Sequence, residues 1–232
     1  MMFLRLLILP LLAVTLFSAC SDSSKTSKNA FWPWFDSRKS EFAELFSYDS
    51  ATAARSDSKL QQRLEDTVTE VGAKLREIHP EFAPFFGASE KGNEMIVTVH
   101  GQATYFDAVD QFITSAPKIE GWTFTALKQP VKFSPDTEIQ SGSARLKAGE
   151  WRYTKSKNKE GSFDFVIYVP AKVSDDQEGF RQLFTNLTMD ALGERLAASA
   201  MGSMEVRELT ENSNQTLSPF TSIHADVSQG MQ

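Results

Sequence analysis

Three kinds of residue in this chain could take part in chemistry: histidines, serines followed by lysines, and closely spaced aspartates. The three histidines lie far apart, and none stands in an HExxH or similar metal-binding spacing. Two Ser-x-x-Lys sequences occur without the companion motifs of a β-lactamase-like site. The sequence therefore predicts no catalytic residue, no metal site and no cofactor. The residues concerned are His79, His100, His224, Ser56 with Lys59, and Ser115 with Lys118.

Asp107 and Asp110 lie near one face of an expected helix and could imitate a carboxylate pair for acid–base catalysis. Solvated acids on helices are far commoner than such pairs, so we interpret both as surface charges. The chain also contains no GxSxG elbow, phosphate-binding glycine loop or dinucleotide fingerprint. An enzyme with an unrecognised site stays open, and a cleft that gathers His100, Asp107 or Asp110 would support it.

The sole cysteine, Cys20, follows the cleavage-like sequence Phe17-Ser18-Ala19. Arg5 precedes the apolar run from Leu6 to Leu16, which is shorter than the roughly 20 residues that span a bilayer as a helix. This start resembles a bacterial lipoprotein signal, with an ordinary secretory signal and a coincidental cysteine as the alternative. We predict a signal peptide over residues 1–19 and lipid attachment at Cys20.

The lipoprotein resemblance implies a location. Proteins of that class carry a diacylglycerol and usually an N-acyl chain such as palmitate, and more than one chain anchors a protein stably. Ser21, rather than Asp, follows the cysteine, which favours the outer membrane facing the periplasm. We therefore expect a protein of the bacterial cell envelope, attached to membrane lipid through its acylated N-terminus. Loss of Arg5 would shift the formal net charge from −6 to −7, and an acidic chain argues against a nucleic-acid partner.

Composition divides the rest of the chain into three parts. Residues 20–30 are polar and aperiodic, which predicts a lipidated, flexible tether. Residues 31–211 are enough for a single α+β domain with its own core. Residues 212–232 are rich in Ser, Asn and Gln, which predicts a poorly ordered C-terminal tail able to dock in part.

Apolar periodicity predicts the elements of the domain. Two β-α-β units with a connecting strand pair indicate a ferredoxin-like α+β sandwich with a mainly antiparallel sheet and an added N-terminal helical hairpin at residues 33–78. The expected helices are Phe31 to about Tyr48, Leu60–Ile78, Thr104 to Pro117 and Asp176–Ala200, and the expected strands are Phe82–Phe86, Glu94–Val99, Trp122–Lys128, Ala144–Thr154, Phe163–Val169 and Met204–Leu209.

One motif joins the helix of the first β-α-β unit to its second strand. Pro117 ends the helix, Gly121 permits a tight entry into the strand, and Trp122 would bury a large ring whose indole N–H needs one acceptor. We interpret these residues as a structural corner, with a ligand-stacking tryptophan as the alternative. Lys128 and Pro130 complete the structural motif.

Residues 116–130, APKIEGWTFTALKQP, resemble a bacterial domain family of unknown function that shares an AP-x-I-x-GW-x-F-x-A-x-K-x-P pattern. Phe106–Val109, Trp32–Phe35 and Leu192–Glu194 with Gly202 match further positions, so the resemblance covers roughly residues 31 to 210. It implies a fold and no activity. The family's distant kinship to regulator of ribonuclease activity B is an analogy of fold alone, because a lipidated envelope protein would not meet that cytoplasmic target.

Six positive charges stand between residues 145 and 159 of an otherwise acidic chain. A basic hairpin could meet anionic lipid, and a solvated loop diluted by Glu150 and Glu160 is the favoured alternative. Trp32 and Trp34 could likewise touch lipid headgroups beside the tether, although core packing of the first helix is the favoured interpretation. The six are Arg145, Lys147, Arg152, Lys155, Lys157 and Lys159.

Three functional hypotheses follow from these patterns. We favour a non-catalytic binding or scaffolding lipoprotein with an envelope protein as its partner, because few polar residues converge in the sequence. The second hypothesis is an immunity or inhibitor lipoprotein that neutralises an envelope enzyme through its acidic face. The third is an enzyme with an unrecognised site. A concave pocket that gathers polar side chains would be the most informative observation.

Overall fold

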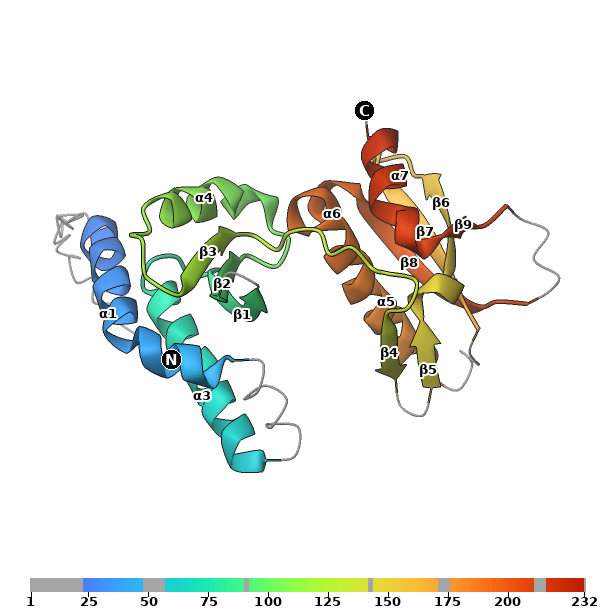
Figure 1. Ribbon diagram of the computed structural model, residues 1–232. Helices are drawn as coiled ribbons and strands as arrows, with labels where there is room; N and C mark the ends of the chain where they lie inside the picture. Colours follow the sequence, from blue (N-terminus) through green and yellow to red (C-terminus); the bar gives the residue numbers. More distant parts are fainter. Residues whose placement is uncertain are drawn as a thin grey trace, which may run out of the picture.

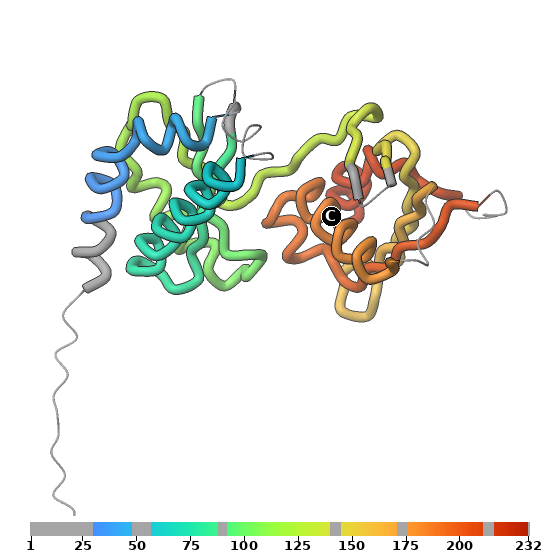
Figure 2. The backbone as a smooth tube through the Cα atoms, turned by 90° about the horizontal axis from the view of Figure 1, so that it is seen from below, coloured from blue at the N-terminus to red at the C-terminus, as the bar shows by residue number. Residues whose placement is uncertain are grey.

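The computed structural model describes residues 23–47, 57–89, 92–141, 144–170, 176–210 and 216–231. These residues form two lobes that are joined by an extended stretch of chain (Figure 1). Figure 2 shows the same division from below, with the connecting chain between the lobes. The predicted signal peptide and Cys20 lie outside the described residues. Within the described ranges, none of the helices combines the length and the apolar character needed to cross a membrane.

The first lobe packs helices against a three-stranded sheet in the order β1-β2-β3. The outer strand β1 is antiparallel to β2, and β3 is parallel to β2, so α4 makes a β-α-β connection between them. Asp57 starts α3 because its side chain accepts from two amides of the first turn. The elements are α1 (Ser23–Leu45), α3 (Ser58–Arg76), β1 (Ala83–Ser89), β2 (Gly92–Thr98), the short 3-10 turn η1 (Ala103–Tyr105), α4 (Phe106–Thr114) and β3 (Trp122–Ala126).

Aromatic side chains fill the core of the first lobe. Trp32 of α1 stacks on Phe112 of α4, with ring centroids 4.7 Å apart, and Phe35 meets the edge of Trp122 at 4.9 Å. Trp32 is only 5% exposed. This burial agrees with core packing of the first helix rather than with contact to lipid headgroups.

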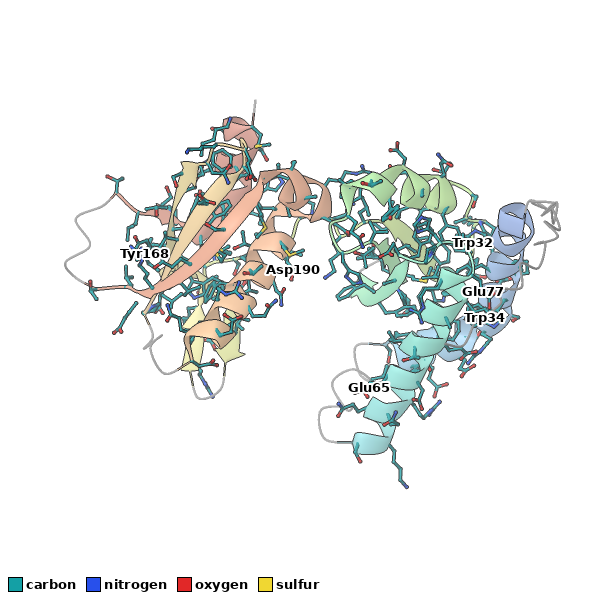
Figure 3. All side chains as sticks on the ribbon, turned by 180° about the vertical axis from the view of Figure 1, so that it is seen from behind. Trp32, Trp34, Glu65, Glu77, Tyr168 and Asp190 are labelled. Atoms are coloured by element: carbon teal, nitrogen blue, oxygen red, sulfur yellow. The ribbon has the colours of Figure 1, made fainter. Side chains whose placement is uncertain are left out.

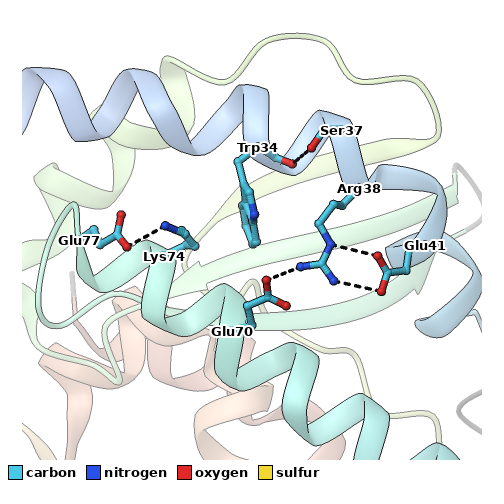
Figure 4. A network of polar contacts seen from close by, with 7 residues as sticks. All are labelled: Trp34, Ser37, Arg38, Glu41, Glu70, Lys74 and Glu77. Atoms are coloured by element: carbon cyan, nitrogen blue, oxygen red, sulfur yellow. Dashed lines mark hydrogen bonds and ion pairs between the residues drawn. The ribbon is translucent and has the colours of Figure 1, made fainter.

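A charged network on the outer side joins α1 to α3 (Figure 4). The Arg38 guanidinium binds both carboxylate oxygens of Glu41 at 3.0 Å and also reaches Glu70 of α3. It lies 4.8 Å from the centroid of the Phe42 ring. Its hydrogen bonds to Glu41 and Glu70 raise the pKa of Arg38, and the same contact lowers the pKa of Glu41. The two helices form the predicted hairpin.

The second lobe is built on a four-stranded sheet in the order β8-β7-β6-β9, with a separate β4-β5 hairpin. The central strand β7 is antiparallel to β6 and parallel to β8, and α5 and α6 connect β7 to β8. The elements are β4 (Glu138–Ser141), β5 (Ala144–Lys147), η2 (Ala148–Glu150), β6 (Arg152–Lys157), β7 (Phe163–Val169), α5 (Gln177–Leu192), α6 (Glu194–Ala200), β8 (Met201–Glu208), β9 (Ser218–Pro219), η4 (Phe220–Ser222) and α7 (Ile223–Gly230).

The α+β class and the N-terminal helices are confirmed, and both predicted β-α-β units form. The described strands divide among three sheets, and the expected domain at 31–211 is built as two lobes with separate hydrophobic cores. The residues between the lobes include Pro130 and Pro135. A proline cannot donate to a strand ladder, so this stretch does not extend either sheet.

Helix α1 begins earlier than the sequence predicts. It starts at Ser23, so residues 23–30 of the predicted tether are helical, and Pro33 lies inside the helix. Residues 23–30 have no apolar periodicity. Since periodicity was the signal for a helix, a polar continuation of the aromatic segment could not be recognised.

Residues 216–231 form β9, η4 and α7, so the prediction of poor order is wrong for them, whereas the expected partial docking of the tail is observed. Phe220, Ile223 and Val227 are at most 1% exposed and belong to the core of the second lobe. Strand β9 pairs with β6, and the Tyr153 hydroxyl donates to Asp226 at 2.6 Å. These three apolar residues share one helical face, but their partners lie far back in the sequence.

Candidate functional site at the lobe junction

A buried glutamate at the start of α6 reaches from the second lobe to the first. Glu194 is 3% exposed, and its two carboxylate oxygens accept four hydrogen bonds. Charge-assisted bonds of this kind offset the cost of burying a carboxylate. Glu194 therefore fastens α6 to the end of β2 and to the connecting chain. The donors are the Thr98 hydroxyl at 2.7 Å and the amides of Val99 at 3.0 Å, Gly101 at 2.8 Å and Lys128 at 3.1 Å.

The backbone around these donors is left-handed at two residues other than glycine. His100 has a φ of 53° and Leu127 has a φ of 60°. Such values are uncommon, especially for a bulky residue such as leucine. They persist because the amides of Gly101 and Lys128, which directly follow, are held by the Glu194 carboxylate.

The connecting chain is also bound along its own backbone. The Glu194 amide donates to the Lys128 carbonyl at 2.8 Å, and the Val131 amide donates to the Asp190 carbonyl at 2.8 Å. Between them, Gly193 lies against Pro130 with a φ of +74°, and a Cβ at Gly193 would stand 2.8 Å from the Pro130 nitrogen. Residues 128–130, which end the quoted motif, therefore meet residues 192–194, a further position covered by the resemblance.

An ion pair adds a second link between the lobes. The Arg195 guanidinium of α6 binds the Asp110 carboxylate of α4 and lies 5.3 Å from the centroid of the Phe106 ring. Both charged side chains are about half exposed, at 51% and 42%. Asp110 thus has a structural partner, and Asp107 on the same helix is exposed.

A polar pocket of about 290 Å³ opens beside Glu194. Lys128 and Asp190 stand in its wall with Nζ and Oδ1 3.7 Å apart, and Figure 3 shows Asp190 on the side of the second lobe that faces the first. The Lys128 ammonium is also 4.8 Å from the centroid of the Phe85 ring, which is 48% exposed. Side chains from both lobes and from the connecting chain line this pocket: Thr98, His100, Lys128, Asn186, Met189, Asp190 and Glu194.

The three histidines lie in different places. His100 is exposed and lines the junction pocket. His79 stacks on Phe82 with ring centroids 4.9 Å apart, and its Nδ1 accepts from the Glu81 amide. His224 lies in a separate pocket beside α7. Of the residues expected to support an enzyme, only His100 stands in the polar pocket.

The predicted corner is part of the first lobe's core. Trp122 is 9% exposed, and its indole N–H donates to the Lys39 carbonyl of α1 at 3.1 Å. Gly121 has a φ of +78°, a value that favours glycine. Pro117 follows α4 and lines a third pocket with Trp32. A buried ring with a partner for its N–H fits a structural corner better than a ligand-stacking platform.

Several of the six basic residues have partners within the chain. Lys147 pairs with Glu138 at 3.3 Å, and the Arg152 guanidinium donates to the Gly149 carbonyl at 2.8 Å. Lys155 donates to the Asp226 carbonyl of α7. These contacts give three of the six basic side chains partners within the chain, which disfavours a free basic patch.

No protein-family model matches this chain, and no curated protein matches it. The resemblance based on the AP-x-I-x-GW pattern therefore stays a prediction. Within the described residues, no cluster of three or more His, Cys, Asp or Glu side chains could hold a metal ion. No sequence motif marks Asn186 or Asp190, and the local signal nearest to them is Gly193, which interrupts the long helix expected at residues 176–200.

Proposed function

We propose that the protein is a non-catalytic, lipid-anchored binding module of the bacterial envelope, and that its ligand site is the junction pocket. The proposal rests on one observation: the side chains that line the pocket come from three parts of the chain. His100 comes from the first lobe, Lys128 from the connecting chain, and Asp190 from the second lobe. Ligand pockets are frequent at interfaces between domains. A ligand here would contact both lobes and stabilise their arrangement.

The acids at the junction support binding rather than turnover. Glu194 is held by four donors, and Asp110 is paired with Arg195. An acid–base catalyst needs a group that can exchange its proton with a substrate. Both acids instead connect the lobes, which leaves Lys128 and Asp190 as the charged pair available to a ligand.

The anchor part of the proposal rests on the sequence around Cys20. Replacing Cys20 with Ser should abolish labelling with palmitate and release the protein from the membrane fraction. A Ser18→Thr variant serves as a nearby control, and we expect it to keep the label. If wild type takes up no palmitate, or if Cys20→Ser stays in the membrane fraction, the lipoprotein assignment is wrong.

Native mass spectrometry of the detergent-solubilised full chain tests the pocket. We expect a small molecule from the envelope to stay bound to wild type and to be lost from an Asp190→Ala variant. Glu138→Gln, which breaks an exposed ion pair in the β4-β5 hairpin, should keep it. Absence of any bound molecule, together with no change in the thermal midpoint on adding the small-molecule fraction of an envelope extract, would contradict the proposal.

An enzyme is the second candidate because His100 lines the pocket and has left-handed backbone. Residues with strained backbone cluster at active sites. Esterase, phosphatase, glycosidase and peptidase assays on wild type and His100→Ala test this candidate. Turnover that is lost in His100→Ala would replace the binding-module proposal. Capture and inhibition of an envelope enzyme by the full chain would instead favour an inhibitor lipoprotein.

A further inference from the structure

We infer that the junction pocket binds a small zwitterion of the amino-acid type, in which one molecule carries both an ammonium group and a carboxylate. This inference rests on the proposed function, because it names the ligand class of the same pocket. It starts from Lys128 and Asp190, the opposite charges of the pocket wall. A zwitterion can give each of them a new partner of opposite sign.

The pair formed by Lys128 and Asp190 is loose. Their charged atoms are 3.7 Å apart, which is longer than a hydrogen bond, and their side chains are 36% and 39% exposed. Ion pairs that are exposed to this degree contribute little to stability. Separating the pair therefore costs little free energy, provided that the ligand supplies a carboxylate to Lys128 and an ammonium group to Asp190.

Other lining residues offer matching partners. The His100 ring makes no hydrogen bond or ion pair within the described part of the chain, so an N–H is available for a ligand carboxylate. The Asn186 side-chain oxygen, which accepts only a long bond of 3.3 Å from Gln182, can accept from a ligand ammonium group. Met189 adds an apolar surface against which a ligand side chain can pack.

The same residues disfavour other classes of ligand. A phosphate would approach the carboxylate of Asp190, and the nearby amides of Val99 and Gly101 are already bonded to Glu194. A sugar would stack on an aromatic face, but the nearby Phe85 ring does not line the pocket, and the Lys128 ammonium stands over it. The volume of about 290 Å³ lies just below the usual range of ligand pockets, so one amino acid fits better than a longer chain.

Calorimetric titration of the detergent-solubilised full chain with three probes tests the inference. The probes are L-leucine, N-acetyl-L-leucine, which lacks the ammonium group, and L-leucinamide, which lacks the carboxylate. We expect L-leucine to bind and each blocked probe to bind at least about tenfold more weakly, because each leaves one charge of the pocket without a new partner.

Two variants test which charged group of the ligand each pocket residue binds. Lys128→Met should weaken L-leucine at least about tenfold and leave L-leucinamide unchanged, while Asp190→Asn should weaken L-leucine and leave N-acetyl-L-leucine unchanged. Lys128→Met keeps the hydrogen bond to the Glu194 carboxylate, because the donor of that bond is the Lys128 backbone amide. Glu138→Gln is the control and should bind L-leucine as wild type does, and unchanged thermal midpoints would show that the variants are folded.

The outcomes separate this inference from the proposed function. If L-leucinamide binds as tightly as L-leucine, the pocket is a cation site and the zwitterion inference is wrong. If L-leucine does not bind, or if N-acetyl-L-leucine binds as tightly as L-leucine, the inference is also wrong, although a different molecule found by native mass spectrometry would still make the pocket a ligand site. If native mass spectrometry and thermal midpoints detect no ligand of any kind, the proposed function itself fails.

Discussion

The carboxylate of Glu194 accepts a hydrogen bond of 2.8 Å from the backbone amide of Gly101, which joins a helix of the second lobe to a loop of the first. The residue before that amide, His100, has left-handed backbone and lines the junction pocket. This contact thus contributes both to the link between the lobes and to the shape of the pocket wall. Glu194 is therefore an informative position to substitute.

Glu194→Ala should lower the free energy of unfolding by about 2–4 kcal/mol, because it leaves several buried donors without an acceptor. Glu194→Gln keeps the size and one acceptor oxygen, so we expect a smaller loss. Urea unfolding followed by circular dichroism measures both. Glu205→Ala, which removes an exposed acid, is the control. If Glu194→Ala has the same urea midpoint as wild type, the hydrogen bonds of the Glu194 carboxylate do not contribute to stability.

Gly193→Ala should be more destabilising than Gly161→Ala. Both glycines have a positive φ, of +74° and +91°, so both substitutions carry a conformational cost of about 1 kcal/mol or more. Only at Gly193 would the new Cβ meet the Pro130 nitrogen at 2.8 Å, whereas nothing lies within 4 Å at Gly161. The difference in thermal midpoint between the two variants measures this clash, because the conformational cost is common to both. Equal losses of stability would show that the connecting chain is not held against α6.

Trp122→Ala should cost about 3–5 kcal/mol, because it removes a buried ring and leaves a cavity. Trp122→Phe is the matched variant. It keeps an aromatic ring next to Phe35 and loses the indole N–H bond to Lys39, so its cost should be smaller. Denaturant midpoints measure both values. A wild-type midpoint for Trp122→Ala would mean that the ring is exposed, and would favour the ligand-stacking alternative.

Alkaline pH should weaken the docking of α7. Burial and the hydrogen bond to Asp226 raise the pKa of Tyr153 above its usual value of 10.0. The folded protein keeps this proton while the unfolded chain loses it near pH 10, so stability is present below that pH and falls as the pH rises. Urea midpoints from pH 8 to 11 should therefore fall more steeply for wild type than for Tyr153→Phe. Parallel curves would contradict a buried Tyr153 hydroxyl.

The sequence alone determined the elements whose signal is local. The stripe of apolar residues from Leu60 to Ile78 predicted α3, and alternation in residues 163–169 predicted β7. The corner at Gly121 and Trp122 could also be predicted from the sequence, because a turn and a buried ring depend mainly on neighbouring residues. The boundary of α1 was missed because the polar residues before Phe31 carry no helical period.

Only the tertiary structure decided the candidate site. Lys128, Pro130 and the segment 192–194 were all noted in the sequence, but nothing local indicated that they touch. The bonds of the Glu194 carboxylate join residues 66 to 96 positions apart. Long sequence separation also explains why the folded C-terminus was not predicted, since Tyr153 and its partner Asp226 are 73 positions apart. Periodicity records which face of an element is buried, whereas the partner of a buried polar group depends on how whole lobes dock.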